Sequence, residues 1–497
     1  MEEKEMNSQD IDSKKREAID GQIAEDGEKT GIDRNVNRQC AMAREMARQI
    51  ALLVEKEGGR AFFVGGCVRD KIAGIANKDI DIEVHGLKPE KLEQILGQVG
   101  RWKTMGTSFG IYSMIGCHLD IAMPRTERTT GRGHRDFRVF VDPYLGPEAA
   151  ARRRDFTVNA LMEDVLTGKI FDAFGGRRDL ERGILRHVDE KTFAEDPLRV
   201  LRGAQFAARF DFSIADETVE LCKTMDLSAL PGERVEGELE KAFLKAEHPS
   251  GFFLALRRME QLGVWFPEIA ALIGVEQNPD YHPEGDVWNH TMMVLDEAAA
   301  LREEARDTMG FMMAALVHDL GKTLTTEQVN GKIHAFQHET KGLPLVENFL
   351  ERLVFPKKRI GYVTNMVELH MKPNAMAARR SGVKSTNRLF DRSVDPKGLI
   401  LLARADHLGR PGATILEENE TFLWERLALF YEMMERPYVK GEDLIASGIL
   451  PGPEFSELLT YAHKLRLAVV EKEAALKQVL GMARGMVRRR GKNDESE

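Results

Sequence analysis

Two acidic residues, Asp79 and Asp81, lie two positions apart in a stretch whose alternation of polar and apolar residues predicts a β-strand. Side chains two positions apart on a strand point to the same face, so the two carboxylates would lie side by side and repel each other. A hard divalent cation relieves such repulsion, and its preferred ligands are carboxylate and phosphate oxygens. Gly65 and Gly66 come shortly before, and backbone without a Cβ atom can approach a polyphosphate closely. The stretch therefore favours a nucleoside-triphosphate site, although an Asp-x-Asp pair also occurs on solvated edge strands.

The letters of this stretch, VGGCVRD and then KDIDIE, resemble the catalytic head of the nucleotidyltransferase superfamily, in the branch of bacterial CCA-adding tRNA nucleotidyltransferases and poly(A) polymerases. The resemblance implies that Asp79 and Asp81 are catalytic and hold Mg²⁺. It also implies that Gly65, Gly66 and Arg69 contact the triphosphate. Motifs of this family follow in the same order over roughly residues 60–420.

Asp120 lies in a second alternating stretch, HLDIAM, which also predicts a strand. The superfamily often has a third acid at this point, so Asp120 could be a metal ligand, but a surface strand residue explains it equally well. We expect two strands over Arg101–Asp120 and a helix over Pro89–Val99. A helix over residues 37–57 is predicted by apolar residues that recur every four positions: Met42, Met46, Ile50 and Val54.

Three consecutive arginines, Arg152–Arg154, begin a second motif with the sequence RRRDFTVNAL. Their mutual repulsion would be costly unless an anion lies nearby, and guanidinium groups suit triphosphate oxygens because they donate paired hydrogen bonds. We expect them at the start of a helical run, where the helix dipole adds to the attraction for phosphate. The motif is similar to the family's RRDxTxNA segment, which implies that Arg154, Asp155 and Asn159 contact the triphosphate and distinguish ribose from deoxyribose.

A third motif, EDPLRVLR, predicts a helix with Pro197 in its first turn and Asp196 as its N-cap. Asp196 could accept a hydrogen bond from a nucleobase amine while Arg199 donates to ring acceptors, which would select cytosine and adenine over uracil and guanine. Arg202, on the same helical face as Arg199, would hold the triphosphate. A helix cap beside a solvated arginine face is the plainer explanation. Gln205 stands where the family usually has arginine. The side expected to be buried comprises Leu198, Leu201 and Phe206.

The stretch RTERTTGRGHRD, residues 125–136, is basic and contains glycine, which predicts a mobile loop. In the resembling family, a loop with a similar start lies beside the head and is needed for addition of the final A. The stretch therefore favours addition of the whole CCA sequence over addition of CC alone, although a solvated surface loop explains it as well.

Histidine is concentrated in one part of the chain, since seven of the thirteen histidines lie within residues 282–407. Four residues there match, in order, the ligands of the HD-domain metal-dependent phosphohydrolases: His290, His318, Asp319 and Asp406. Imidazole and carboxylate together suit Ni²⁺, Mn²⁺ or Mg²⁺ and leave positions for water. His338 and His370 could hold a second ion. The resemblance to longer bacterial CCA-adding enzymes implies phosphodiesterase, 2′-nucleotidase and phosphatase activities as candidates.

The composition bounds the class of protein. With 497 residues the chain is too long for one core. Its net charge of -9 means that any RNA binding must come from local basic patches. The four cysteines form no Cys-x-x-Cys motif, which argues for a reducing cytoplasm and against a cysteine-built zinc site. No apolar run approaches the ~20 residues of a membrane span.

Together these motifs predict an α+β chain in which a mixed-sheet nucleotidyltransferase head is followed by a helical neck and an all-α HD domain. We expect a disordered acidic tail over residues 1–35 and the head over residues 36–190. The neck, with its nucleotide-selecting helix, would span residues 191–275, the HD domain residues 276–420, and a C-terminal helical region residues 421–497.

The expected activity is template-independent, two-metal addition of CCA to the 3′ end of tRNA from CTP and ATP, in the cytoplasm and away from membranes. A poly(A) polymerase or an enzyme that adds only CC or only A would share every head motif. From another class, the protein could be chiefly an HD phosphohydrolase with an inactive head. A non-catalytic RNA-binding scaffold is the remaining alternative, and the sequence does not give the oligomeric state.

Overall fold

The computed structural model describes residues 31–75, 79–104, 110–129, 137–414 and 416–493. The predicted tail therefore lies almost wholly outside the described residues, as does part of the predicted loop, at 130–136. The described chain forms two compact units, one of residues up to 199 together with 213–225, and one of residues 200–212 and 226–497. None of the described helices combines the length and apolar character that crossing a bilayer requires.

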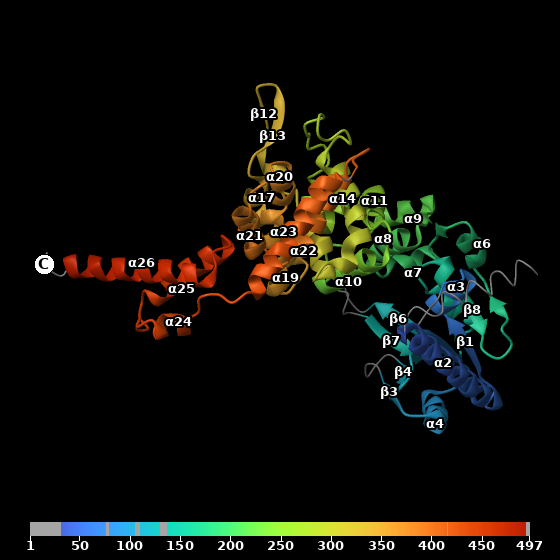
Figure 1. The fold of residues 1–497 in the computed structure, drawn as a ribbon. Coiled ribbons are helices and arrows are strands. Elements are labelled where there is room, and N and C mark those ends of the chain that lie inside the picture. Colours follow the sequence, from blue (N-terminus) through green and yellow to red (C-terminus); the bar gives the residue numbers. More distant parts are fainter. Residues whose placement is uncertain (1–30, 76–78, 105–109, 130–136, 415, 494–497) are drawn as a thin grey trace, which may run out of the picture. The chain divides into compact units, whose positions relative to one another are not determined.

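The first unit is built on a mixed sheet of seven strands in the order β3-β4-β5-β2-β1-β8-β9 (Figure 1). Strands β2 and β5 run parallel, and the other neighbours in the sheet are antiparallel. The described residues between 101 and 122 form three short strands, and the last of them, β5, lies in the predicted strand HLDIAM. The strand bounds are β1 Arg60–Val64, β2 Ile80–His85, β3 Trp102–Thr104, β4 Ile111–Met114, β5 Leu119–Ala122, β8 Met162–Asp164 and β9 Ile170–Phe171.

Helix α2, Gly31–Lys56, packs on β1, β2 and helix α4, Pro89–Val99. It begins six residues before the predicted start, and the recurring apolar residues that predicted it are not all buried. Ile50 and Val54 are buried as expected, whereas Met42 is exposed because the small residues Ala43 and Ala47 take the inner positions. Small side chains let the helix backbone lie close to the sheet. The bounds of α4 are those predicted from the sequence.

The remaining elements of the first unit are a hairpin, a parallel strand pair and short helices. They are α3 Gly66–Ile72, β6 Arg125–Thr129, β7 Phe137–Val141, α5 Pro147–Arg152, the 3₁₀ turn η1 Thr157–Asn159, α6 Gly176–Glu181, β10 Ile184–Leu185, α7 Glu190–Ala194, β11 Ser213–Ile214 and α9 Asp216–Lys223.

The expectation that the three arginines begin a helical run is wrong. Arg152 is the last residue of α5, and after it the chain makes only the 3₁₀ turn η1 before entering β8. Asp155 explains this, because its carboxylate accepts hydrogen bonds from the backbone N–H of Phe156 and the amide of Asn159. A side chain that bonds its own neighbourhood in this way competes with helix formation.

The second unit is helical. Helix α15, Thr308–Val317, is buried on all sides, as its uniformly apolar sequence requires. It packs against α14 Val287–Leu301, α19 Lys357–Leu369 and α22 Pro396–Leu408. The other elements are α8 Leu198–Phe210, α10 Gly232–Lys245, α11 Ser250–Arg258, α12 Leu262–Trp265, α13 Pro267–Ala270, η2 Arg302–Glu304, α16 Lys322–Thr325, α17 His338–Lys341, α18 Leu343–Arg352, α20 Lys372–Ala378 and α21 Val383–Arg392.

Two further parts of this unit stand apart in Figure 1. The hairpin of β12, Thr326–Val329, and β13, Lys332–Ala335, projects from the helices. The C-terminal region is helical, as expected, and has a small core of its own around Leu444, Leu458 and Val479. Its helices are α23 Glu417–Glu435, α24 Gly441–Ala446, α25 Phe455–Leu467 and α26 Lys472–Asn493.

The burial of α15 leads to a stability prediction. Phe311→Ala should lower the free energy of unfolding of the second unit by about 3–5 kcal/mol, because it leaves a cavity among fully buried neighbours. Leu254→Ala is the matched control, since Leu254 is half exposed in α11 and its loss should cost far less. Urea unfolding followed by tryptophan fluorescence measures both. Equal effects of the two substitutions would contradict the packing described here.

Candidate nucleotide site and candidate metal centre

Asp81 and Asp120 lie opposite each other in the head. They are register partners in the parallel strands β2 and β5, so their side chains lie on the same face of the sheet. Burial raises the pKa of Asp81 to about 6, with further contributions from the charges of Asp120 and Asp79, while Arg154 acts in the opposite direction. A buried carboxylate whose charge is opposed by neighbouring acids fits a hard divalent cation.

Asp79 occupies the last position before β2, and its side chain is largely exposed. Its carboxylate lies 3.8 Å from Nδ1 of His118, the residue before β5. No sequence motif singles out His118, because the pairing of β2 with β5 is what brings it to Asp79.

Arg154 connects the glycine turn to the acidic strand. Gly65 has a φ of 69°, and a Cβ atom there would lie 3.1 Å from the Arg154 guanidinium, so glycine is required for this approach. The same guanidinium lies 3.5 Å from Oε2 of Glu83, whose Oε1 is 2.9 Å from Nε2 of His85. Burial would raise the pKa of Glu83, but His85 and Arg154 hold it below its usual value. Gly66 begins α3 directly after this turn.

Three residues predicted to contact the triphosphate, Arg69, Asp155 and Asn159, lie in a buried hydrogen-bonded network, and their contact with triphosphate stays a prediction. Arg69 donates to Asp70 Oδ1 at 2.6 Å and to the side-chain oxygen of Asn159 at 2.6 Å. The Asn159 amide in turn donates to Asp155 at 3.0 Å. All four side chains are buried, so in this arrangement they brace the turn that follows Arg154. The structure brings these predicted residues together.

A cavity of about 220 Å³ opens beside β2 and β5, and four arginines line it with Glu83. Arg199 donates to the carbonyl oxygens of Thr192 at 2.5 Å and Arg153 at 2.8 Å, which fixes its guanidinium without cancelling its charge. The cavity therefore suits a polyanion. Its lining residues are Glu83, Ile111, Ala122, Met123, Arg125, Ala150, Arg153, Arg154 and Arg199.

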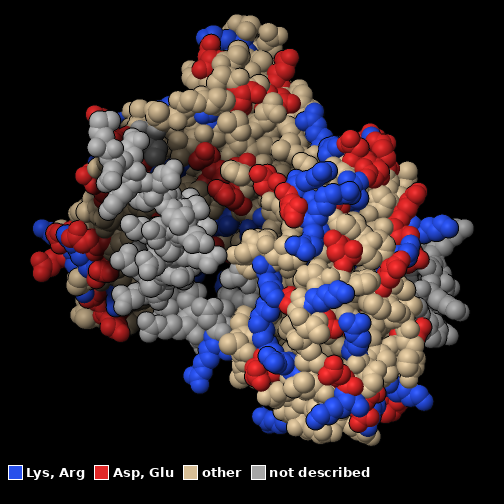
Figure 2. Space-filling model, turned by 90° about the vertical axis from the view of Figure 1, so that its right-hand side faces the viewer, with Lys and Arg blue, Asp and Glu red and all other residues tan. Residues whose placement is uncertain are grey.

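Basic and acidic groups are mixed on the visible surface. On the face drawn in Figure 2, Lys and Arg side chains form short runs among Asp and Glu side chains. This agrees with the expectation, drawn from the net charge, that basic attraction is local.

The predicted selecting helix is α8, which begins at Leu198. Asp196 lies just before it and accepts a hydrogen bond from the Leu198 N–H at 3.1 Å. Arg202, in the second unit, lies 4.0 Å from Glu238 and over the ring of Phe206, and its contact with triphosphate stays a prediction. The side of α8 expected to be buried is buried: Leu198, Leu201 and Phe206.

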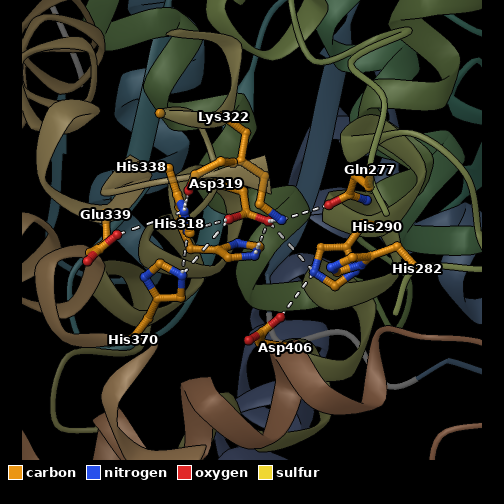
Figure 3. Close-up of polar contacts among 12 residues, drawn as sticks. Gln277, His282, His290, His318, Asp319, Lys322, His338, Glu339, His370 and Asp406 are labelled. Atoms are coloured by element: carbon orange, nitrogen blue, oxygen red, sulfur yellow. Dashed lines mark hydrogen bonds and ion pairs between the residues drawn. The ribbon is translucent and has the colours of Figure 1, made fainter. Parts of the chain in front are cut away.

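The second unit gathers the predicted HD residues at one point (Figure 3). They come from different elements, and His318 and His370 directly follow the ends of α15 and α19. Helix α15 ends at Val317, and Gly321 lies four residues further on. A Cβ atom at Gly321 would collide with the carbonyl oxygen of His338. Glycine at this position thus lets helix α17 come close to the segment that contains His318 and Asp319.

Asp319 is the centre of this cluster. Its Oδ2 lies 3.1 Å from Nε2 of His318 and 3.8 Å from Nε2 of His290. Lys322 contacts the same oxygen at 2.7 Å and is held from the other side by Gln277, also at 2.7 Å. The surrounding positive groups hold the pKa of the buried Asp319 well below its usual value, against the effect of burial.

His290 connects two acids. Its Nε2 is 3.0 Å from Oδ1 of Asp406, and its Nδ1 is 2.9 Å from Oε1 of Glu284. Although burial lowers the pKa of His290, these two partners raise it to about 9. Despite partial burial, the pKa of Glu284 is lowered to about 2, chiefly by its hydrogen bond with His290. A carboxylate behind a histidine can orient the ring toward a metal, so Glu284 is a candidate site residue that sequence reasoning missed. The motif YHPEGDVWNH, which contains it, was the available signal.

The donor set fits a divalent metal ion. Ligand atoms of His290, His318 and Asp319 lie within 4.8 Å of one another, and all three residues are buried. His318 Nε2 and Asp319 Oδ1 find no hydrogen-bond partner of suitable geometry within the described chain. Buried polar atoms without partners are uncommon and point to a missing ligand.

Two stretches of the chain match known families. Residues 61–186 match the poly(A) polymerase head domain, and residues 287–410 match the HD domain. The acidic strands β2 and β5 lie within the first match, and the cluster around Asp319 lies within the second. Fold and sites therefore define a nucleotidyltransferase head that is joined in one chain to an HD domain.

Proteins with similar sequences define the family more closely. The chain is 34% identical over 429 residues to the multifunctional CCA protein of Alkalilimnicola ehrlichii. The aligned residues cover 83% of this chain and 98% of that protein. It is 37% identical over 402 residues to the multifunctional CCA protein of Pasteurella multocida, with coverage of 78% and 92%. The chain belongs to the family of multifunctional CCA proteins, which confirms the resemblance seen in its motifs.

Solved structures share the fold. The CCA-adding enzyme of Thermotoga maritima, complexed with tRNA, matches with a TM-score of 0.60 and 23% identity over 88% of this chain and 95% of that one. The CCA-adding enzyme of Bacillus stearothermophilus, in complex with CTP, matches with a TM-score of 0.59 and 21% identity over 90% and 98%. The predicted fold class, a mixed-sheet head followed by helical regions, is confirmed.

The raised pKa of Asp81 leads to a pH prediction. Below pH 6 a proton occupies Asp81 and competes with the cation, so the affinity of the head for Mn²⁺ should fall by up to about tenfold per pH unit. Above pH 6 the affinity should level off. Calorimetry from pH 5 to 8 on His318→Ala protein, which lacks one HD ligand, measures the head.

The control for this prediction is Asp120→Asn. It removes a charge that raises the pKa of Asp81, so the midpoint of the pH dependence should move below 6. An affinity that does not change with pH in the His318→Ala protein would refute the coupling of the two acids.

Proposed function

We propose that the protein extends the 3′ end of tRNA with CCA, using CTP and ATP and no nucleic-acid template. The observation that carries this proposal is the cavity in which four arginines converge beside the acidic strands β2 and β5. The names of the relatives support it, and so do the solved CCA-adding enzymes that contain tRNA or CTP.

In the proposed reaction, the RNA 3′-hydroxyl oxygen bonds to the α-phosphorus of the incoming nucleotide while the bond from that phosphorus to pyrophosphate breaks. Asp79, Asp81 and Asp120 would hold two Mg²⁺ ions, whose charge lowers the pKa of the hydroxyl and neutralises the departing pyrophosphate. Arg154 binds phosphate oxygens from the cavity side, and Gly65 leaves room for it to do so. No side chain forms a covalent intermediate.

Asp196 and Arg199 would select the base. Cytosine and adenine each carry an amine beside a ring nitrogen, whereas uracil and guanine offer a carbonyl group there. The Arg199 guanidinium is fixed by the carbonyl groups of Thr192 and Arg153, and Asp196 is fixed by its bond to Leu198. A pair of groups held this rigidly can accept CTP and ATP while rejecting UTP and GTP.

Incubation with tRNA that lacks its terminus, together with CTP and ATP, tests this activity. We expect extension to stop after three nucleotides, and Asp81→Ala should slow it by at least about a thousandfold because the ion site is lost. Glu90→Ala, an exposed acid on α4, is the matched control and should leave the rate unchanged.

The products of that incubation separate the alternatives. Long A tails would make the protein a poly(A) polymerase, and extension with only one of the nucleotides would make it a CC-adding or A-adding enzyme. No extension at all would support an HD phosphohydrolase with an inactive head.

For the HD cluster we propose metal-dependent hydrolysis of phosphate esters, such as a terminal 2′,3′-cyclic phosphate. The proposed ligands of an ion such as Ni²⁺, Mn²⁺ or Mg²⁺ are His290, His318, Asp319 and Asp406. The ion would supply Lewis acidity toward the phosphoryl oxygens. Glu284 holds the ring of His290 in position, and Lys322 adds positive charge beside Asp319.

The two activities should be separable. His318→Ala should abolish hydrolysis of 2′,3′-cyclic AMP and leave CCA addition within about twofold, because the ligand lies in the other unit. His463→Ala, an exposed histidine of α25, is the control. Hydrolysis that survives in His318→Ala protein would place the activity elsewhere.

A further inference from the structure

The hairpin of β12 and β13 is joined at both ends to segments that hold the HD cluster. Strand β12 directly follows α16, whose Lys322 contacts Asp319 at 2.7 Å, and β13 is followed after two residues by α17, which begins at His338. The carbonyl oxygen of Ala335, the last residue of β13, lies 2.9 Å from Nδ1 of His338. The base of the hairpin therefore adjoins the cluster, while its strands project from the helices (Figure 1).

Two aromatic rings are stacked at this base. The rings of His334 and Phe336 have their centroids 4.9 Å apart and are inclined to each other by only 10°. Phe336 lies one residue beyond the pair of Thr326 with Ala335 that closes the hairpin, and 54% of its surface is exposed. A ring that has one face covered and still exposes half of its surface leaves the opposite face open to solvent. We call His334 and Phe336 the aromatic platform.

The backbone keeps Phe336 outside while His338 turns inward. Gln337, which lies between them, has a φ of 59°, which is uncommon for a residue other than glycine. Its carbonyl oxygen accepts hydrogen bonds from the backbone N–H groups of Thr340 and Lys341, which hold it in place as the N-cap of α17. Phe336 is consequently exposed and His338 is buried, although one residue separates them. The platform is thus fixed at the edge of the cluster.

The chemistry of the platform suits a nucleobase. An exposed aromatic face stacks with any of the bases, because each base has a π-face of its own. The Cα atom of Phe336 is about 3.8 Å from that of Ala335, whose carbonyl oxygen contacts His338. A nucleotide carries its base one sugar away from its phosphate. A single nucleotide can therefore place its phosphate at the HD cluster and its base on the platform.

We propose that the aromatic platform stacks the base of the nucleotide whose phosphate ester lies at the HD cluster. This inference rests on the phosphohydrolase activity proposed above and extends it, because it narrows the substrate class from phosphate esters in general to nucleoside phosphates. Phe336 is a positioning residue that holds the substrate by its base and takes no part in breaking the ester bond. The contact is made equally before and during the reaction, so it governs substrate affinity.

Hydrolysis of esters with and without a base tests the proposal. The substrates are 2′,3′-cyclic AMP and methyl ribofuranoside 2,3-cyclic phosphate, which lacks the base, and each is incubated with the full chain and Mn²⁺. Phe336→Ala should raise KM for 2′,3′-cyclic AMP by about tenfold and leave kcat within about twofold, because stacking is lost while the cluster is intact. Hydrolysis of the ester without a base should not change.

Two further variants separate stacking from general damage to the hairpin. Phe336→Trp retains a flat ring and should keep KM for 2′,3′-cyclic AMP within about threefold of the unsubstituted chain. Val329→Ala, an exposed apolar residue at the end of β12, is the matched control and should change KM for neither ester. Equal losses toward both esters in Phe336→Ala protein would overturn the platform. So would a Phe336→Ala protein in which only the sedimentation changes, since the ring would then join two copies of the chain.

A binding measurement decides on the platform even if neither ester is hydrolysed. The fluorescence of 2-aminopurine riboside 2′-phosphate is quenched when its base stacks on an aromatic ring. With Mg²⁺ present, we expect quenching by the unsubstituted chain and by Val329→Ala protein, and loss of most of it in Phe336→Ala protein. Equal quenching by all three would overturn the platform. Quenching that depends on Phe336 without any hydrolysis would support the platform and overturn only the proposed phosphohydrolase activity.

Discussion

The repulsion between Asp81 and Asp120 is the interaction on which the head depends. Parallel pairing of β2 with β5 fixes the two acids in register, and burial of Asp81 denies them the relief that water would give. Arg154 offsets part of the charge while it rests against Gly65 and pairs with Glu83. A cation would offset the remaining negative charge, and the arginine-lined cavity beside it suits a polyanion. A nucleoside triphosphate with bound Mg²⁺ carries a cation that suits the acids and phosphates that suit the arginines.

The HD cluster applies the same principle with other donors. Its ligands stand at the ends of helices, where His318 and His370 give their Nδ1 hydrogens to carbonyl groups three residues earlier. The opposite nitrogen of each ring is thereby turned toward Asp319. Close approach of backbone at Gly321 brings His338 into the same group. Buried donors fixed in this way cost stability unless a ligand binds, so an ion held by this cluster would also stabilise the fold.

The sequence predicted most of what is local. Alternation located β2, periodicity located α4, and the order of the histidines and acids located the HD residues. What it missed depends on long-range contact. No local pattern shows that Asp120 pairs in register with Asp81. Nor does one show that Arg69 donates a hydrogen bond to Asn159 or that Glu284 contacts Nδ1 of His290. The helix predicted after the three arginines failed for a local reason. Asp155 accepts hydrogen bonds from Phe156 and Asn159, and these bonds compete with helix formation.

One measurement tests most directly whether the head acids hold a cation at the nucleotide's phosphates. Mn²⁺ bound to the head of His318→Ala protein relaxes the phosphorus nuclei of CTP according to their distance from the ion. We expect strong broadening of the α-phosphate signal, and its loss in protein that also carries Asp81→Asn. Tight CTP binding with unbroadened phosphate signals would show that the acids and the nucleotide do not meet, which would contradict the mechanism proposed for the head.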